Sequence, residues 1–291
     1  MTRLNEFDRI ARLVLKHPRE AFGDRSSIAR QWQPLNYPAA PDLGRATDEY
    51  EAFVELLGSN GAEISFLPAD ERTGLDSVYV RDASIAAPGG MILLNMGKAL
   101  RSGEPDAQGD AFARLGIPVV GRIEPPGTLE GGDLVWLDET TVAVGEGYRT
   151  NAEGIRQLRA LLGPAIDVIV AQLPHWHGAG EVLHLMSLIS PVDRDLAVVY
   201  SPLMAAPFRS ILLDRGVTLV ETGDGEFDSM GTNVLAIAPR RCVMLAGNPK
   251  TQAELEAAGA DVLSYQGLEI SVKGAGGPTC LTRPITRGPR P

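Results

Sequence analysis

The sequence has few cysteines, few aromatic residues and no long hydrophobic segment. Its two cysteines, Cys242 and Cys280, lack the CxxC spacing of zinc and redox sites. Aromatic residues make up 5% of the 291 residues, whereas 32 glycines and 21 prolines indicate short elements joined by tight turns. No segment approaches the roughly 20 apolar residues that a membrane-spanning helix needs. Residues 1–8 contain no apolar signal region, so we expect a cytoplasmic location.

Positive charge is also scarce. The chain has 27 Lys and Arg against 37 Asp and Glu, which gives a net charge of −10. Nucleic acids and anionic membrane surfaces require clustered cations, so we expect neither as a partner. A negative field favours a small cationic ligand instead. The hydrophobic content of 44% is typical of a globular protein.

One pattern of elements occurs five times along the chain. Each unit consists of a short apolar strand, a turn, a second strand, an amphipathic helix and a β-branched strand. The units are expected at residues 7–70, 76–121, 128–171, 182–221 and 231–291. A period of about 50 residues is compatible with propellers, and no linker divides the chain. The sequence therefore predicts a single catalytic α/β domain whose five units surround a central site, with an open α/β sheet as the alternative.

Several element bounds follow from this pattern. Apolar spacing predicts a helix at 48–57 and strands at 77–80 and 185–189. The polar, proline-containing segment 22–41 is expected to be a mobile loop that closes over the site. Cys242, inside an apolar run, is expected in a core strand.

Cys280 is preceded by an unusual loop, in which three glycines and a proline fall within residues 274–278. Glycine lets the backbone approach a ligand closely because it has no Cβ. Such a loop could present the thiol to a substrate. Alternatively, Cys280 is a small buried core residue, as most free cysteines are.

A nucleophilic thiol needs a base or a cation beside it. Of four histidines, His184 is the best candidate, because it lies where a polar loop enters an apolar strand; a core histidine is the alternative. His17 precedes a proline and is expected at the surface. His175 and His177 could bind a metal, but no third ligand is evident, so we expect neither a metal nor another cofactor.

Acidic residues gather at similar places. Glu130 and Asp133 flank a diglycine just before a strand, and Asp76 and Asp82 flank a four-residue apolar segment. Each motif alone is weak, because turns favour these residue types. In a five-unit ring, however, equivalent strand ends face one centre. Cys280, His184, Glu130 and Asp82 would then meet there from four different units, which predicts a catalytic cluster.

Together these motifs resemble a known family. The ordered set VRD at 80–82, LEGGD at 129–133, GYRTN at 147–151, LHL at 183–185 and GGPTC at 276–280 is similar to the guanidino-group-modifying enzymes. These include dimethylarginine dimethylaminohydrolase, arginine deiminase and the amidinotransferases, which share the five-bladed α/β propeller called the pentein fold. The chain length and the motif CLT at 280–282 look nearest to the dimethylarginine dimethylaminohydrolases.

The resemblance implies a role for each residue. Cys280 would attack the guanidinium carbon and form a covalent thiouronium, while His184 would protonate the leaving amine and later activate water. Glu130 would orient His184 or contact the substrate. Asp82, with Asp76 nearby, would bind the guanidinium N–H groups. Arg149 would hold a substrate carboxylate or, alternatively, bond the end of the following helix.

Two departures from the family pattern concern the substrate. Met186 stands where deiminases of free arginine carry a second aspartate, which favours an N-substituted guanidine, unless Met186 is only a strand residue that packs inward. The carboxylate-binding arginine of the family aligns with Met96, although Lys98 or Arg101 could replace it. Arg81 stands where the family has an acidic residue, and its cation could repel an ammonium group or attract an anion.

The expected function is therefore a cysteine-dependent hydrolase of a substituted guanidine. The expected reaction converts N-omega-methylated arginine to citrulline and methylamine or dimethylamine. A deiminase or amidinotransferase of another guanidino compound is the alternative within enzymes, and a propeller that only binds arginine-like metabolites is the alternative outside them. The partner is then a small cationic guanidino compound, and a homodimer is left open.

Overall fold

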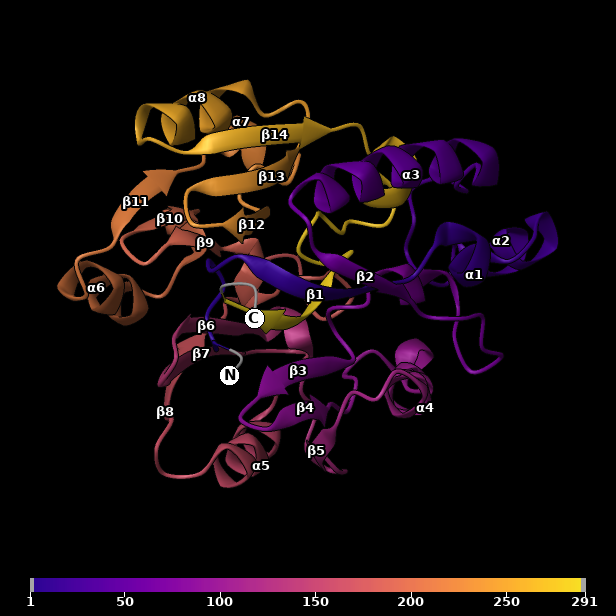
Figure 1. Cartoon of the computed structure of the whole chain (residues 1–291), viewed down its shortest axis with the longest axis horizontal. Helices are drawn as coiled ribbons and strands as arrows, with labels where there is room; N and C mark the ends of the chain where they lie inside the picture. Colours follow the sequence, from indigo (N-terminus) through magenta and orange to yellow (C-terminus); the bar gives the residue numbers. More distant parts are fainter. Residues whose placement is uncertain (1–2, 289–291) are drawn as a thin grey trace.

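The computed structural model describes residues 3–288 and contains five three-stranded sheets arranged around a centre (Figure 1). The strands are β1 (Ile10–Leu15), β2 (Glu63–Phe66), β3 (Ser84–Ala87), β4 (Gly90–Leu93), β5 (Val119–Arg122), β6 (Leu134–Asp138), β7 (Thr141–Glu146), β8 (Asp167–Gln172), β9 (Ile189–Asp193), β10 (Leu196–Val199), β11 (Thr218–Glu221), β12 (Val234–Ala238), β13 (Arg241–Leu245), β14 (Asp261–Tyr265) and β15 (Arg283–Arg287). Their orders are β15-β1-β2, β3-β4-β5, β6-β7-β8, β9-β10-β11 and β12-β13-β14.

Every sheet is built in the same way. In the second sheet, β3 pairs antiparallel with β4 with Ser84 opposite Leu93, and β4 pairs parallel with β5 with Ile92 opposite Gly121. A short turn suffices for the antiparallel pair, whereas the parallel pair needs a crossover, which a helix provides. The helices are α1 (Pro18–Phe22), α2 (Arg25–Gln31), α3 (Leu43–Ser59), α4 (Glu104–Arg114), α5 (Ala152–Leu162), α6 (Ala206–Asp214), α7 (Asp224–Phe227) and α8 (Pro249–Ala257). Figure 1 shows α3, α4, α5, α6 and α8 on the outside of the ring.

The two ends of the described chain meet in one sheet and close the ring. β15 pairs antiparallel with β1, with Leu13 opposite Pro284. The sequence pattern assigns this last strand to unit 231–291, but it completes the first sheet. One strand of each antiparallel pair lies toward the ring axis: β15 in the first sheet and the earlier strand of the pair in the other four. There β9 contacts β12 and β15 contacts β3. We call β3, β6, β9, β12 and β15 the inner strands.

Two predicted strands are wrong. Residues 77–80 and 185–189 were expected to be extended, but 3₁₀ helices form at Leu75–Val78 and Leu185–Ser187. Both lie just before an inner strand. The helix predicted at 48–57 begins earlier, because the Asp42 side chain accepts from the N–H of Arg45 and caps α3. The segment 22–41 is not all loop, since it contains α2.

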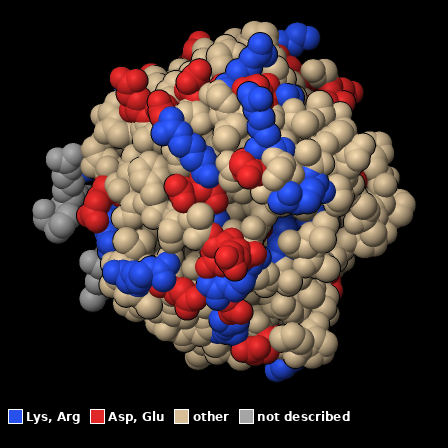
Figure 2. Space-filling model, turned by 90° about the vertical axis from the view of Figure 1, so that its right-hand side faces the viewer, with Lys and Arg blue, Asp and Glu red and all other residues tan. Residues whose placement is uncertain are grey.

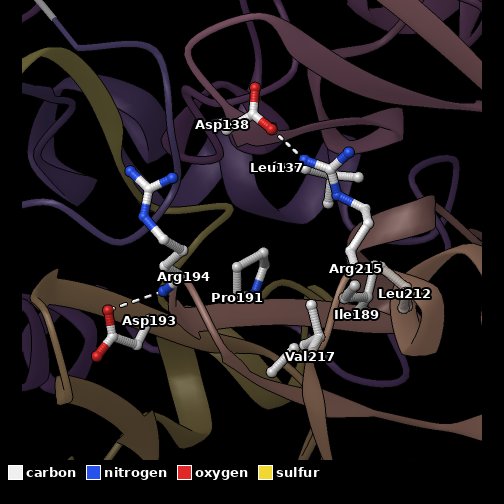
Figure 3. Close-up of a pocket in the computed structure, with 10 residues that line it drawn as sticks. Leu137, Asp138, Ile189, Pro191, Asp193, Arg194, Leu212, Arg215 and Val217 are labelled. Carbon is white, nitrogen blue, oxygen red and sulfur yellow. Dashed lines mark hydrogen bonds and ion pairs between the residues drawn. The ribbon is translucent and has the colours of Figure 1, made fainter.

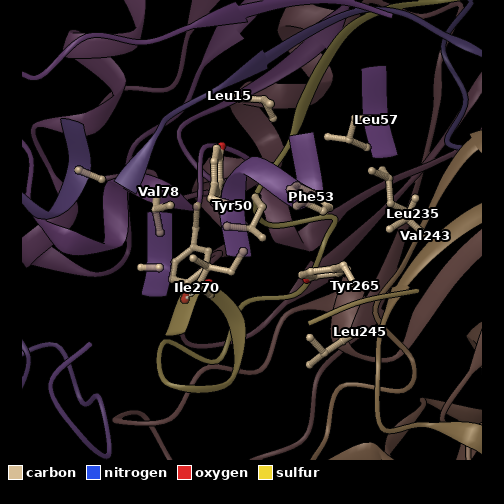
Figure 4. Packing of buried hydrophobic residues seen from close by; sticks show 14 of the residues in the cluster. Leu15, Tyr50, Phe53, Leu57, Val78, Leu235, Val243, Leu245, Tyr265 and Ile270 are labelled. Carbon is tan, nitrogen blue, oxygen red and sulfur yellow. Dashed lines mark hydrogen bonds between the residues drawn. The ribbon is translucent and has the colours of Figure 1, made fainter. Parts of the chain in front are cut away.

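The core between α3 and the first and fifth sheets shows why the α3 sequence is helical. Tyr50, Phe53 and Leu57 are at most 1% exposed and lie on one face of the helix (Figure 4). The ring of Phe53 packs 4.7 Å from that of Tyr265 in β14. Cys242 is fully buried in a neighbouring cluster, which confirms that it is a core strand residue.

The surface carries charges of both signs. Figure 2 shows Lys and Arg side chains interspersed with Asp and Glu over one face of the molecule. Among the described residues, no helix combines the length and the apolar character needed to cross a membrane.

Candidate active site

Four of the predicted residues come together at one end of the ring. The inner strands β3, β6, β9 and β15 are preceded by Asp82, Glu130, His184 and Cys280, respectively. Asp82, His184 and Cys280 line one cavity of about 60 Å³, and Glu130 lies directly behind His184. The prediction that equivalent strand ends face one centre is therefore confirmed. Asp76 and Arg149 line the same cavity.

Glu130 is held in place from several sides. Its carboxylate is fully buried, and Oε2 lies 2.8 Å from Nε2 of His184. Oε2 also accepts from Nη1 of Arg149 at 3.1 Å, and Oε1 accepts from the backbone N–H of Lys98 at 2.9 Å. Burial alone would raise the pKa of Glu130, but its hydrogen bond to His184 and the cations of His184 and Arg149 lower the pKa to about 2. Glu130 is thus ionised at neutral pH.

His184 is surrounded by carboxylates. Burial alone would lower its pKa, but the charges of Asp133 and Asp82 and the hydrogen bond to Glu130 outweigh burial and raise the pKa to about 9. Nδ1 lies 3.9 Å from Oδ1 of Asp82. Asp133 also fixes the backbone, because its Oδ1 accepts from the N–H of Leu185 at 3.0 Å. At neutral pH His184 is therefore a positioned imidazolium, a group that can donate a proton.

The lack of space around Gly132 explains why the acidic motif has a glycine at this position. A Cβ at this position would lie 2.3 Å from Nδ1 of His184 and 3.0 Å from Oδ1 of Asp82. Its backbone N–H donates to Oδ1 of Asp82 at 3.0 Å. Only glycine leaves room for the imidazole here.

Cys280 has an amide partner that sequence reasoning missed. Nδ2 of Asn233 donates to Sγ of Cys280 at 3.5 Å, while its Oδ1 accepts from the N–H of Thr279 at 3.0 Å and from its Oγ1 at 2.9 Å. Asn233 directly precedes β12, the remaining inner strand, so its position in the repeat could have identified it. Burial, followed by the charge of Asp82, raises the pKa of the Cys280 thiol.

Asp82 and Asp76, the two candidates for guanidinium binding, already pair with cationic side chains of the protein. Oδ2 of Asp82 accepts from Nη1 of Arg101 at 2.5 Å, and Oδ2 of Asp76 accepts from Nζ of Lys98 at 2.6 Å. Both cations line the cavity with the acids. Met96 is 5% exposed and is not among the residues that line it, whereas Lys98 and Arg101, expected as its substitutes, are.

Arg81 occupies a different place from the one expected. Its guanidinium is 1% exposed; Nε donates to the carbonyl of Thr279 at 3.0 Å, and Nη1 bonds Glu6 at 3.2 Å. The side chain lines another cavity, beyond the inner strands. The expectation that its cation faces the substrate is corrected, because a buried guanidinium needs a carboxylate and Glu6 supplies it.

Arg149 bonds Glu130 and not the helix that follows it. Asn151 caps α5 instead, by accepting from the N–H of Gly154 at 2.8 Å. The segment 22–41, expected to cover the site, reaches the cavity through Leu35 and Asn36. Nδ2 of Asn36 donates to the carbonyl of Gly180 across the rim at 3.0 Å.

A second cavity of about 190 Å³ adjoins Cys280 and His184. Its walls are mainly apolar and come from Trp176, Leu183, Met186, Phe227 and Met230. Met186 is 3% exposed and belongs to this wall. The exposed carboxylate of Glu181 lies at the rim of both cavities, and nothing in the sequence motifs had singled it out.

These features coincide with a sequence match over most of the chain. Residues 31–287 match the model of the family described as N,N dimethylarginine dimethylhydrolase, eukaryotic. The chain belongs to this family. It is accordingly a guanidino-modifying enzyme that hydrolyses C–N bonds.

Similar proteins of the family come from bacteria. The chain is 32% identical to N(G),N(G)-dimethylarginine dimethylaminohydrolase of Streptomyces coelicolor over 83% of this chain and 86% of the relative. It is 29% identical to the Pseudomonas aeruginosa enzyme of that name, over 83% and 89%. An arginine deiminase of Mycobacterium marinum is 31% identical, but over only 56% of this chain and 48% of the deiminase.

Solved structures confirm the five-bladed pentein fold. A cysteine-to-serine variant of the dimethylarginine dimethylaminohydrolase of Pseudomonas aeruginosa, complexed with citrulline, has a TM-score of 0.76 at 25% identity, covering 94% of this chain and 99% of that chain. The amidinotransferase SxtG from Microseira wollei, at 15% identity, has a TM-score of 0.80 and covers 99% and 98%.

The residue cluster contains three groups that a metal ion could bridge. The ligand atoms of Asp82, Glu130 and His184 lie within 4.8 Å of one another. Their oxygens, however, already accept from Arg101, Arg149 and backbone N–H groups. This donor set fits an imidazolium and guanidinium network better than a divalent cation. The two loop histidines have partners of other kinds, since His175 bonds the hydroxyl of Tyr148 and His177 packs on Trp176.

A larger cavity, about 290 Å³, is lined by none of the residues of this cluster. Figure 3 shows the residues that line it. Leu137, Pro191 and Val217 line it between the third and fourth sheets, and Arg215 forms an ion pair with Asp138 at its edge. None of the predicted family residues is among those that line it.

Proposed function

We propose that this chain hydrolyses an N-substituted guanidine, with N-omega-methylated arginine as the first candidate, through a covalent intermediate on Cys280. One observation carries the proposal: Cys280 and His184 line the same cavity, and Glu130 lies 2.8 Å behind His184. A thiol that shares a cavity with a protonated imidazole and buried carboxylates is suited to a planar cation with a leaving amine. The citrulline complex of the related enzyme is consistent with a ureido product.

The cation is bound by carboxylates. Asp82, with Asp76 farther along the wall, receives the guanidinium N–H groups; a carboxylate has about four acceptor positions, so Asp82 can serve Arg101 and a substrate together. The substrate carboxylate is received by Arg149, Lys98 or Arg101, which line the same cavity. Arg149 has five N–H donors, and in the part of the chain that the structure describes its side chain bonds Glu130 through Nη1 alone, which leaves donors for a ligand.

Substrate binding activates the nucleophile. In the free protein the thiol of Cys280 has a raised pKa and is neutral at pH 7. A guanidinium held over Sγ adds a positive charge beside it, which lowers the pKa and favours the thiolate. The proton leaves to solvent, and the sulfur attacks the guanidinium carbon to give a tetrahedral adduct.

His184 then carries the proton transfers. As an imidazolium it protonates the substituted nitrogen, the C–N bond breaks, and an amine departs from a thiouronium on Cys280. The neutral imidazole next accepts a proton from water as the hydroxide attacks the same carbon. The C–S bond then breaks, the hydroxyl group of the adduct loses its proton to solvent, and the ureido product and the thiolate are released. Glu130 keeps the ring oriented and stabilises its charge in both steps.

The apolar cavity receives the substituent. Met186 lies in its wall, where it offers no hydrogen bond to an N–H group but packs against an alkyl group. Methylated arginine would thus give citrulline and methylamine or dimethylamine. At about 190 Å³, the cavity also has room for substituents larger than methyl.

Three other functions remain as alternatives. A deiminase would release ammonia from an unsubstituted guanidine, and an amidinotransferase would pass the amidine to an amine in place of water. A propeller that only binds arginine-like metabolites would have no use for a thiol and an imidazolium in one cavity.

A product assay tests the proposal. Purified protein is incubated with Nω,Nω-dimethylarginine, Nω-propylarginine, arginine and other guanidino acids, and the ureido product and released amine are measured. We expect citrulline and dimethylamine, lost in Cys280→Ser and retained in the matched control Cys242→Ser. Ammonia from arginine alone would favour the deiminase, and no turnover with an unreactive Cys280 would refute the hydrolase.

A further inference from the structure

We propose that a small monovalent anion of the chloride type binds beyond the inner strands, at the end of the ring axis away from Cys280, between Arg81, Arg283 and Arg287. The inner strands β3 and β15 begin beside the active site and run away from it. Ala86, near the end of β3, and Arg287, at the end of β15, line a cavity there together with Arg81 and Glu6. This proposal concerns a second site and does not rest on the proposed reaction.

The cluster contains more positive than negative charge. Arg81, Arg283 and Arg287 are 1%, 3% and 4% exposed, respectively. Among the residues that line the cavity, the acidic one is Glu6, whose Oε2 lies 3.2 Å from Nη1 of Arg81 and 3.7 Å from Nη2 of Arg287. The cavity therefore contains three buried cations and one carboxylate, which pairs with Arg81 and Arg287 but has no ion pair with Arg283 among the contacts of the described residues.

Other nearby acids are engaged elsewhere. The side chain of Asp8 accepts from Nδ2 of Asn5 at 3.0 Å and from Arg3 at 3.3 Å. Asp82, on the active-site side, is bonded to Arg101 and Gly132. Neither carboxylate forms a hydrogen bond with the three arginines among the contacts of the described residues.

Each arginine also retains a donor without a partner. Nη2 of Arg81, Nε of Arg283 and Nη2 of Arg287 are buried and have no hydrogen-bond acceptor within residues 3–288. Arg287 does use Nη1, on the carbonyls of Asp8 and Ala236, at 2.6 and 2.8 Å. Buried donors in native proteins are nearly always satisfied, so an acceptor is expected at this point.

The missing acceptor should carry a negative charge. Burial, followed by repulsion from Arg81, lowers the pKa of Arg283, and burial lowers the pKa of Arg287 to about 10. Guanidinium groups nevertheless keep their protons at neutral pH. Water would satisfy the N–H groups but would leave the charge uncompensated, whereas an anion does both.

The volume of the cavity limits the size of the anion that can bind. It measures about 20 Å³, which is room for about one water-sized sphere. Chloride and bromide fit such a space, whereas sulfate, phosphate and organic carboxylates are too large. The ligand is accordingly a halide.

The site is connected to the nucleophile through Arg81. Nε of Arg81 donates to the carbonyl of Thr279 at 3.0 Å, and its backbone N–H donates to the carbonyl of Cys280 at 3.2 Å. An anion that holds the end of this side chain therefore also steadies the loop that presents the thiol. Its effect should be seen first in stability.

The test compares halides with larger anions at constant ionic strength. The melting temperature of the full chain is measured in sodium gluconate with increasing sodium chloride, bromide or sulfate. We expect a saturable rise with chloride and bromide and none with sulfate. In a bromide-soaked crystal, an anomalous peak is expected within hydrogen-bonding distance of Arg81, Arg283 and Arg287.

Variants separate this site from general salt effects. Arg283→Met should lose the halide-dependent rise, whereas the exposed control Arg156→Met should keep it. If Arg283→Met does not fold, the bromide peak in the unaltered protein decides. A halide effect that persists in Arg283→Met, a peak elsewhere, or no halide-specific rise would overturn the proposal. All these readouts are independent of catalysis.

Discussion

Oε2 of Glu130 lies 2.8 Å from Nε2 of His184, in a position where the carboxylate has no contact with solvent. The pair joins two inner strands, because Glu130 precedes β6 and His184 precedes β9. Since the carboxylate stabilises the charged ring, it contributes to raising the pKa of His184 to about 9. With the charges of Asp133 and Asp82, which raise this pKa more, Glu130 keeps His184 protonated at neutral pH, so the ring can act as an acid.

The first prediction concerns this pair. In Glu130→Gln the imidazolium loses a negative neighbour, so the pKa of His184 falls. Because the amine can depart only after the protonated ring gives it a proton, the alkaline limb of the pH profile of kcat should shift to lower pH. We expect kcat to fall by roughly 100-fold or more, as for loss of general acid catalysis. Steady-state kinetics from pH 6 to 10 measure both effects.

A control is needed because Glu130→Gln also leaves Arg149 without its carboxylate. Glu226→Gln removes a different buried carboxylate, one that bonds Thr251 and the N–H of Lys250. It should leave the alkaline limb unchanged even if the protein is less stable. An unshifted limb in Glu130→Gln would contradict the assigned role.

The second prediction concerns stability, because the same pKa shift links folding to pH. His184 has an ordinary pKa of 6.5 and a folded value of about 9. The stabilisation should therefore be complete below pH 6.5 and be lost as pH rises through 9. Its size is on the order of 3 kcal/mol. The unfolding free energy of the unaltered protein minus that of His184→Gln, measured from pH 6 to 10, should decrease over this window; a constant difference would argue against a charged ring.

The third prediction concerns the thiol. Burial raises the pKa of Cys280 above its ordinary value of 9.0, so alkylation by neutral iodoacetamide should have a midpoint above pH 9. A cationic haloacetamidine brings its own positive charge to Sγ, so its midpoint should be lower. Rates in a Cys242→Ser background report Cys280 alone, and cysteine in solution serves as the control. Equal midpoints for the two reagents would contradict activation by the bound cation.

The sequence alone predicted the five-unit ring and most of the residues that gather at its centre. The reason is physical: short apolar strands and amphipathic helices recur with one period, and polar residues stand at the same place in each unit. The sequence is thus enough to place Cys280, His184 and Glu130 at one centre.

Three features could not be predicted, because they depend on contacts between units. Which way Arg81 points is decided by Glu6, 75 residues away in the sequence. β15 joins β1 because the ring must close, a pairing that local patterns do not encode. The segments at 77–80 and 185–189 have strand-like composition. The structure has 3₁₀ helices there instead, and these helices place Asp82 and His184 near the axis.

The fourth prediction concerns substrate choice. Met186→Asp places a carboxylate in the apolar cavity, where it can accept from an unsubstituted guanidinium nitrogen. The kcat/KM for dimethylarginine should fall at least about tenfold, and that for arginine should rise relative to it. Met186→Leu, which keeps the wall apolar, is the matched control and should retain the preference for the substituted substrate. If Met186→Asp leaves the ratio unchanged, the substituent does not occupy this cavity.

The fifth prediction concerns Asn233, whose Nδ2 donates to Sγ of Cys280 at 3.5 Å. A donor favours the thiolate, so its removal in Asn233→Ala should raise the pKa of the thiol, and Asn233→Asp should raise it further because it adds a negative charge. The alkylation midpoint should therefore rise in the order unaltered protein, Asn233→Ala, Asn233→Asp. Activity should fall in the same order.

A purely structural role of Asn233 would give a different order. Its Oδ1 accepts from the N–H and the hydroxyl of Thr279, and an aspartate can still accept both bonds. If Asn233 only supported the loop, Asn233→Asp would resemble the unaltered protein and Asn233→Ala would be the poorer variant. Melting temperatures measured beside the alkylation midpoints distinguish the two cases, because loop support would appear in stability and thiolate stabilisation in the midpoint. A higher midpoint in Asn233→Asp than in Asn233→Ala therefore assigns the amide to the nucleophile.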